Sequence, residues 1–393
     1  IYAHYYLGGI FFGSGDYDRA LELLKEFIKH PDDIKADRHY DRAERMIKDA
    51  EFLSRMYNNP VPFEPRSVES ICTPMDEYLP TISADNEIAF FTRKYEKKMK
   101  GDQFAKLVEE FTFSDRVDNK FTRGKPMPPP FNSGQNEGGA TLTIDNNHMF
   151  FTICKSTTTG YYNCDIYSAD YIINTDVLTI ADSALVQGQM REFGAKGRAN
   201  VVYGSEYKWG NIENLGPEIN SLDSWESQPS ISSDGKTLYF SSIRPGGYGG
   251  MDIYKTIKNS TGKWGKPINL GPLINTEHNE KSPFIHPDKQ TLYFSSDGLM
   301  GLGGYDIFLV KIGKNGQWKK PKNIGYPINT EADDLGLFVS TDGKMAYFAS
   351  NTTTDKLKGK GGWDLHSFPL YEGARPGKVL FLKGELKDEL GEE

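Results

Sequence analysis

The spacing of apolar positions in this chain changes near residue 60. Up to residue 57, Leu7, Phe11, Leu21 and Leu24 follow a helical spacing that a Gly-Ser-Gly turn interrupts. Beyond that point, short apolar runs alternate with turns rich in Gly, Asp and Ser. The pattern predicts a small α-helical domain over residues 1–57, followed by many short β-strands.

The second part of the chain is built from repeats. The segment Leu238–Ser242 recurs 54 residues later as Leu292–Ser296, and a related copy begins at Tyr347. Two weaker copies upstream bring the number of units to five. Each unit predicts four strands, the first two joined by a turn such as Asp234-Gly235, which tolerates positive φ. Tandem four-stranded units of this size predict a mainly β fold, a five-bladed β-propeller.

The fifth unit has three strands, ending near Phe368, but no closing strand follows it. A segment that resembles the closing strand and linker of the other units lies ahead of the first unit. We therefore expect residues near Pro62–Ile71 to pair with the last blade, so that the propeller covers residues 61–371. The length beyond five regular units is expected mainly in the second blade, between about Asp170 and Tyr207.

Composition limits the function. The chain has 393 residues and a net charge of −8, which argues against a nucleic-acid binder, because such a protein needs a basic surface. No apolar run approaches the roughly 18 residues of a membrane span. The 40 glycines and 45 phenylalanine and tyrosine residues (23 and 22) fit short strands joined by tight turns.

Three cysteines are too few for a disulfide scaffold. Cys154 and Cys164 flank a loop of nine residues. If the loop joins two adjacent strands, their thiols face each other, and a disulfide fits an oxidising compartment. The open alternative is two reduced, buried cysteines.

The motifs of common enzyme and metal sites are missing. There is no Gly-x-Ser-x-Gly elbow and no His-Glu-x-x-His, and the seven histidines are scattered. Glycine clusters such as Gly246–Gly250 lie between the second and third strands of a unit, where turn geometry explains them better than phosphate binding. We expect no catalytic residues, no metal, no cofactor and no enzymatic activity.

The long loops between second and third strands emerge on the same face of a propeller as the linkers between blades. Binding sites are commonly built on such loops. The residues at or beside them that are typical of interfaces are Arg244, Tyr248, Tyr305 and Trp363, and we expect these to contact a partner. The alternative is that the aromatic side chains pack between blades.

Two sets of motifs in the chain each resemble a known repeat family. The pattern Ser-x-Asp-Gly-Lys-x-Leu-Tyr-Phe-Ser-Ser, then Gly-Gly-x-Asp-Ile-Tyr and Trp-Gly-x-Pro-x-Asn-Leu-Gly, resembles the WD40-like repeats related to the TolB propeller. The order Leu7-Gly8-x-x-Phe11, Gly15-Asp16-Tyr17, Ala20 and Pro31 resembles one tetratricopeptide repeat. Residues 378–393 look like the start of a truncated carboxypeptidase-regulatory-like β domain. Together they resemble OmpA-family proteins of Bacteroidetes, a group that includes a periplasmic component of the type IX secretion system.

The resemblance implies a periplasmic protein associated with the outer membrane. It implies a non-catalytic scaffold that links other envelope or secretion-system proteins to the cell wall. Peptidoglycan would be bound only through an OmpA-like domain that this sequence does not contain. A function of a different class stays open, namely a propeller enzyme or glycan-binding lectin with its site in the central channel.

Overall fold

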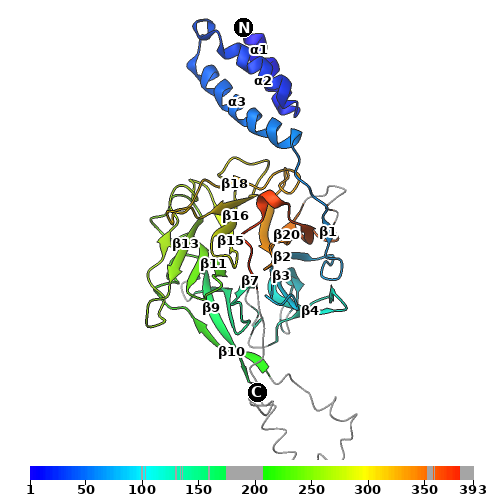
Figure 1. Cartoon of the computed structure of the whole chain (residues 1–393), viewed down its shortest axis with the longest axis vertical. Coiled ribbons are helices and arrows are strands. Elements are labelled where there is room, and N and C mark those ends of the chain that lie inside the picture. Colours follow the sequence, from blue (N-terminus) through cyan, green and yellow to red (C-terminus); the bar gives the residue numbers. More distant parts are fainter. Residues whose placement is uncertain are drawn as a thin grey trace, which may run out of the picture.

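A computed structural model describes residues 1–98, 101, 103–128, 131–132, 134, 136–157, 160–173, 207–351, 357 and 359–380. Three helices precede a five-bladed β-propeller, which confirms the predicted fold class (Figure 1). The expected insertion in the second blade and the expected β domain at residues 378–393 lie largely outside the described residues.

The helical unit contains α1 (Tyr2–Gly13), α2 (Tyr17–Ile28) and α3 (Asp37–Asn58), with the short turn η1 (Pro31–Asp33) after α2. Asp16 begins α2, because its carboxylate accepts a hydrogen bond from the Arg19 backbone N–H. Helices α1 and α2 approach closely at Gly8, where a Cβ would lie 2.7 Å from Leu24 Cγ. Leu24 and Phe27 form the buried centre of this unit.

The strands form five antiparallel sheets, one for each blade. Blade 1 has β2 (Asp76–Ile82), β3 (Ile88–Lys97), β4 (Lys106–Val117), β5 (Lys120–Phe121) and β6 (Lys125–Pro126). Blade 2 has β7 (Asn136–Leu142), β8 (His148–Ser156), β9 (Tyr162–Ile173) and β10 (Tyr207–Asn214). Blade 3 has β11 (Glu226–Ile231), β12 (Thr237–Ser242), β13 (Asp252–Ile257) and β14 (Ile268–Asn269). Blade 4 has β15 (Glu280–Ile285), β16 (Thr291–Ser296), β17 (Asp306–Lys311) and β18 (Lys322–Asn323).

Blade 5 has β19 (Asp334–Val339), β20 (Met345–Ser350), β21 (Asp364–Pro369) and, as its outer strand, β1 (Arg66–Ser67). Strand β1 pairs antiparallel with β21, and the Val68 N–H extends the pairing to the Leu365 carbonyl. A strand that precedes the propeller in sequence therefore completes its last sheet. Phe63 adds apolar contact there, with its ring centroid 4.9 Å from that of Phe368.

The innermost strand of every blade carries a bulge at the same place. The residues with positive φ at these bulges are Leu79, Gly139, Gln228, Ser282 and Gly336. A bulge bends the strand and increases its twist, so the repeated bulge turns all five strands along the central channel in the same way.

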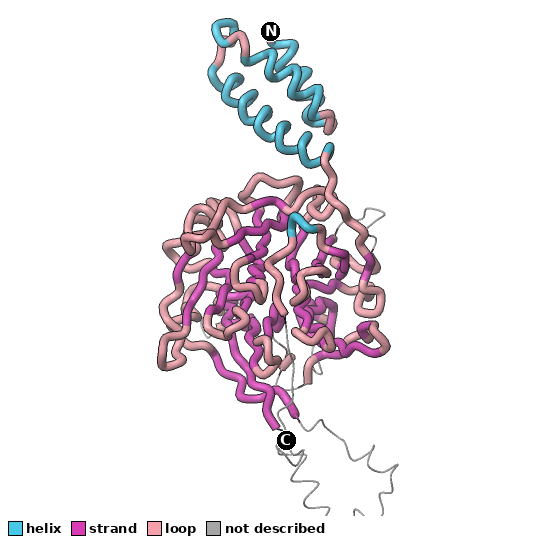
Figure 2. Tube along the Cα trace, in the orientation of Figure 1, coloured by secondary structure: helices cyan, strands magenta, loops and turns pink. Residues whose placement is uncertain are grey.

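Figure 2 shows the N-terminal helices standing at the edge of the strand-rich propeller. The Tyr57 hydroxyl at the end of α3 donates to Glu331 Oε1 (3.2 Å), and its ring centroid lies 4.8 Å from that of Tyr326. Among the described residues, no helix is long and apolar enough to cross a bilayer.

Candidate functional site

The central channel is narrow. Two hollows along it have volumes of about 40 and 50 Å³ and are lined mainly by glycine, proline, threonine and apolar side chains. The Gln228 side chain narrows it further, because its Oε1 accepts a hydrogen bond from the Ser282 N–H (2.7 Å). Since a water molecule takes roughly 30 Å³ in the liquid, neither hollow is large enough for a sugar ring. No ionisable side chain lines these hollows of the described propeller.

A buried carboxylate stands near the start of every innermost strand. These residues are Glu77, Glu137, Glu226, Glu280 and Asp334, each at most 2% exposed. Glu280, for example, accepts hydrogen bonds from the Thr276 N–H and hydroxyl and from the Ser296 hydroxyl (all 2.7 Å). The carboxylate thereby joins the incoming linker to the end of the second strand.

A second buried acid begins the third strand in blades 3, 4 and 5. Asp252 accepts hydrogen bonds from the backbone N–H groups of Tyr248 (2.6 Å) and Gly249 (3.2 Å). Asp306 and Asp364 bind the glycine-rich loops of their own blades in the same way. The glycines let the loop fold over the aspartate: a Cβ on Gly247 would lie 2.3 Å from Asp252 Oδ2.

Sequence reasoning missed both sets of acids. Their signal was visible, because Glu226, Glu280 and Asp334 recur every 54 residues. The sequence does not show that these side chains are buried, however, and an acidic residue next to a strand is usually a solvated turn residue.

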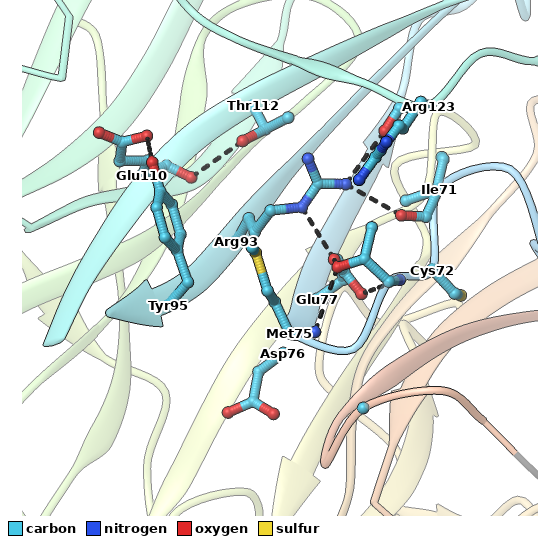
Figure 3. A network of polar contacts seen from close by, with 12 residues as sticks. Ile71, Cys72, Met75, Asp76, Glu77, Arg93, Tyr95, Glu110, Thr112 and Arg123 are labelled. Atoms are coloured by element: carbon cyan, nitrogen blue, oxygen red, sulfur yellow. Dashed lines mark hydrogen bonds and ion pairs between the residues drawn. The ribbon is translucent and has the colours of Figure 1, made fainter. Parts of the chain in front are cut away.

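The contact between blades 5 and 1 contains the polar network of Figure 3. Arg93 Nε donates to Glu77 Oε1 (2.8 Å), and Arg93 Nη2 donates to the Ile71 carbonyl (2.9 Å). Burial raises the pKa of Glu77, and hydrogen bonds from Thr73 and Arg93 oppose this effect. The Cys72 thiol beside it donates to the Leu365 carbonyl (3.3 Å).

Two of the expected partner-binding residues lie in blade 3. Arg244 points into the blade: its Nη2 is 3.1 Å from Glu226 Oε1 and donates to the Ile219 carbonyl (2.6 Å). Its guanidinium also lies over the Tyr254 ring, 5.0 Å from the centroid. The Tyr248 side chain, by contrast, is half exposed.

The other two lie in blades 4 and 5. The Tyr305 ring faces the Lys281 ammonium, 3.5 Å from its centroid, and burial together with Asp297 raises the pKa of Tyr305 to about 12. Trp363 packs against the apolar cluster that joins blades 5 and 1. Three of the four residues thus make contacts within the propeller, and Trp363 packs between blades. Contact of any of the four with a partner stays a prediction.

Cys154 on β8 and Cys164 on β9 occupy directly opposite positions and form a disulfide, with Cα atoms 3.9 Å apart. Their loop does join two adjacent strands. The remaining cysteine, Cys72, is free and buried.

Two surface grooves were not foreseen from the sequence. The larger, about 810 Å³, lies between α1 and α3 and is lined by Tyr6, Ile10, Arg38, Arg42 and Arg45 among others. The second, about 560 Å³, lies between blades 2 and 3. It brings together His148, Asp170, Asp234 and Trp264. Both depend on how separate elements pack, which no linear motif records.

No family model and no curated protein sequence matches the chain. Similar solved structures include TolB from Acinetobacter baumannii, 11% identical with a TM-score of 0.39 over 86% of this chain and 71% of that one. A glycosyl hydrolase from Bacteroides ovatus is 9% identical, with a TM-score of 0.43 over 82% and 97%. The α-L-arabinofuranosidase PaAbf62A from Podospora anserina is 8% identical, with a TM-score of 0.46 over 79% and 97%. At these identities the similarity concerns the fold alone.

The expectation that the chain is not an enzyme was wrong. The structures with a similar fold are mostly glycoside hydrolases, including several α-L-arabinofuranosidases and a family-43 enzyme. A propeller can bring catalytic carboxylates together from separate blades, so missing linear motifs exclude no activity. The non-catalytic part of the expected function is therefore withdrawn.

Proposed function

We propose that the chain is a scaffold that binds another macromolecule through the groove between α1 and α3. The composition of this groove carries the proposal. Tyr6 and Ile10 expose 59% and 64% of their surface on one side, and Arg38, Arg42 and Arg45 line the other.

The arginines indicate the chemistry of the partner. Within the described residues, Arg38, Arg42 and Arg45 form no ion pair, although other charged residues of the helical unit, such as Lys25 and Glu51, do. Arginine and aromatic side chains are the usual anchors of protein interfaces. The surface therefore fits a partner segment that carries carboxylates beside apolar side chains.

The sequence motifs support a location for this scaffold. They resemble the Bacteroidetes group that contains the type IX secretion component PorE. We propose a periplasmic protein at the outer membrane whose partners are other envelope or secretion-system proteins. Peptidoglycan would be bound only by an OmpA-like domain outside this sequence. The long-loop face of the propeller, with Tyr248, is the proposed second contact.

The test is charge reversal in the groove. The double variant Arg42→Glu/Arg45→Glu should lose at least tenfold in affinity for the partner captured from the source envelope. Lys48→Glu, an exposed cation on α3 that does not line the groove, is the matched control and should bind normally. Equal binding by both variants would reject the groove. Loss of binding on reversing Asp234 and Asp342 instead would place the contact on the propeller face that carries the short Asp-Gly turns.

The groove between blades 2 and 3 favours a second function, recognition or cleavage of a glycan. His148 Nδ1 lies 2.7 Å from Asp170 Oδ1 there, and Asp145, Asp234 and Trp264 line the same groove. Glycoside hydrolysis usually needs two carboxylates, and aromatic side chains commonly bind sugar rings. A glycan array and reducing-sugar assay with the intact chain, repeated with Asp170→Asn, would detect this activity. Absence of binding and turnover in both would exclude it.

A further inference from the structure

One position departs from the repeat where blade 5 meets blade 1. In the other linkers an asparagine binds both backbone groups of a third-strand residue; these are Asn132, Asn220, Asn275 and Asn329. Asn275 Nδ2 donates to the Ile253 carbonyl, and its Oδ1 accepts the Ile253 N–H. Cys72 stands at the corresponding place before blade 1.

The thiol lies beside two buried carboxylates. The Cys72 Sγ and one oxygen each of Glu77 and Asp364 all lie within 4.8 Å of one another. The three residues are at most 3% exposed. Asp364 Oδ2 accepts the N–H groups of Lys360 and Gly361, whereas Asp364 Oδ1 has no hydrogen-bond partner in the described part of the chain.

Glu77 also keeps coordinating capacity. Its Oε1 is occupied by Arg93 and by the Thr73 hydroxyl, but Oε2 accepts the Thr73 N–H (3.1 Å). A carboxylate oxygen has two lone pairs, so one remains on Oε2. A buried thiol therefore lies next to two carboxylates that each have an oxygen able to accept more.

We propose that Cys72, Glu77 and Asp364 bind a divalent transition-metal ion of the zinc class, which would bridge blades 5 and 1. A sulfur ligand with two carboxylates suits zinc, cobalt or a similar ion and does not suit calcium or magnesium, which take oxygen ligands. A tetrahedral ion would draw the ligand atoms to roughly 3.5 Å from one another, a movement of about 1 Å from their present limit. One position would stay open for water.

The charge of the site fits a dication. Glu77, Asp364 and an ionised Cys72 supply three negative charges, and Arg93 supplies one positive charge. When no ion is present the buried Cys72 thiol carries its proton and donates it to the Leu365 carbonyl (3.3 Å). A bound dication would displace that proton and neutralise the remaining charge. Binding should therefore release a proton and strengthen as the pH rises.

The thiol distinguishes this site from the other blades. Asp306 in blade 4 also has an Oδ1 without a partner among the described residues, but its linker carries Asn329. The aspartate is common to the repeat, whereas the cysteine is found only where the ring closes. The expectation of no metal rested on local spacing, which cannot detect ligands 292 residues apart.

Cobalt(II) titration of the full chain, first freed of metal with a chelator, tests the proposal. The wild type should take up one cobalt ion per chain with a thiolate-to-cobalt charge-transfer band, and zinc should displace it. With Cys154 and Cys164 joined in a disulfide, that band reports on Cys72. Cys72→Asn should lose the band and at least tenfold in affinity. Asp306→Asn should keep both and is the control for a buried aspartate.

The Cys72→Asn variant is expected to fold, because asparagine occupies this position in the other linkers. It should melt as cooperatively as the wild type, while a chelator should lower the melting temperature of metal-loaded wild type only. Failure of the wild type to bind cobalt stoichiometrically would overturn the proposal. So would a folded Cys72→Asn variant that binds cobalt with the same affinity. If that variant did not fold, Asp364→Asn would be measured in its place under the same criteria.

Discussion

The Asp76 carboxylate accepts a hydrogen bond from the Trp363 backbone N–H (3.1 Å) although the two residues are 287 positions apart in the chain. The same contact joins other neighbouring blades: Asp333 accepts the Tyr305 N–H (2.9 Å) and Asn279 accepts the Met251 N–H (3.1 Å). The junction between the last and first blades is therefore closed by the contact that joins blades elsewhere in the ring. Strand β1, which lies ahead of blade 1 in the sequence, adds to this closure by pairing with β21.

Two deletions distinguish the contribution of this closure to stability from the contribution of the helical unit. Deletion of residues 1–59 removes α1 to α3 and should leave a folded propeller. Its melting temperature should fall by no more than a few degrees. Deletion of residues 1–72 also removes β1, Phe63 and the partner of Leu365, which exposes a sheet edge and apolar surface. The longer deletion should aggregate or melt without cooperativity, as measured by circular dichroism and size-exclusion chromatography. Similar behaviour of the two truncated chains would mean that β1 does not secure the ring.

The blade architecture could be predicted because the signals that specify it lie close together in the sequence. Each Asp-Gly turn and each apolar run repeats at a constant spacing, and the missing fifth closing strand pointed to the segment that contains Arg66 and Ser67. Strand identity and blade number follow from such short-range signals.

The site-level features could not be predicted in the same way. Arg244 looks like an exposed interface residue in sequence, yet the structure buries its guanidinium against Glu226, which lies 18 residues earlier on another strand. The groove between α1 and α3 depends on the angle at which two helices pack. The cluster at Cys72 requires Asp364, almost the whole propeller away. A single sequence shows that positions such as Asn279 and Asp333 recur 54 residues apart, but it does not show which residue of a neighbouring blade each of them contacts.

Arg244 and Tyr248 should respond differently to alanine substitution. The Glu226 side chain is fully buried, so Arg244→Ala leaves a buried carboxylate without its cation and should destabilise the fold by about 3–5 kcal/mol. Tyr248→Ala removes a half-exposed ring and should change the free energy of unfolding by less than about 0.5 kcal/mol. Urea denaturation of both variants measures the difference. Equal stability of the two would place the Arg244 guanidinium in solvent.

Asp334 should make the stability of the propeller depend on pH. Burial raises the pKa of Asp334 to about 7, although hydrogen bonds from Thr330 and Ser350 oppose the effect, and neighbouring Asp306 has its pKa raised to about 6. An unfolded aspartate loses its proton near pH 4, roughly, so between there and about pH 7 the folded chain holds more protons than the unfolded one. Asp334 alone should consequently make stability fall as the pH rises through this window, by up to about 1.4 kcal/mol per pH unit, and Asp306 should add to the fall below about pH 6. The fall should level off above about pH 7.

The variant Asp334→Asn removes this titration. Its melting temperature should vary less than that of the wild type between roughly pH 4 and 7. At the upper end of this range the variant should be more stable than the wild type. Asp342→Asn, in an exposed surface turn, is the control and should reproduce the wild-type pH profile. A wild-type profile that rises with pH over this range would contradict the assignment.

The disulfide between Cys154 and Cys164 should stabilise blade 2. The two cysteines are separated by 10 positions, and closing so short a loop in the unfolded chain corresponds to about 2–3 kcal/mol in the chain-entropy treatment. The variant Cys154→Ser/Cys164→Ser should be less stable by that amount and should no longer respond to a reductant, whereas reduction should lower the stability of the wild type.

Thiol titration of the denatured chain decides whether the bridge forms in the cell. Protein isolated without reductant should show one reactive thiol, that of Cys72, and three after reduction. Because structural disulfides persist in oxidising compartments, one reactive thiol would also support the periplasmic location proposed above. Three reactive thiols in protein taken directly from its source, with alkylation at lysis to prevent exchange, would show that the pair is reduced. Its Cα separation of 3.9 Å would then describe two facing thiols on β8 and β9, and the argument for an oxidising compartment would be lost.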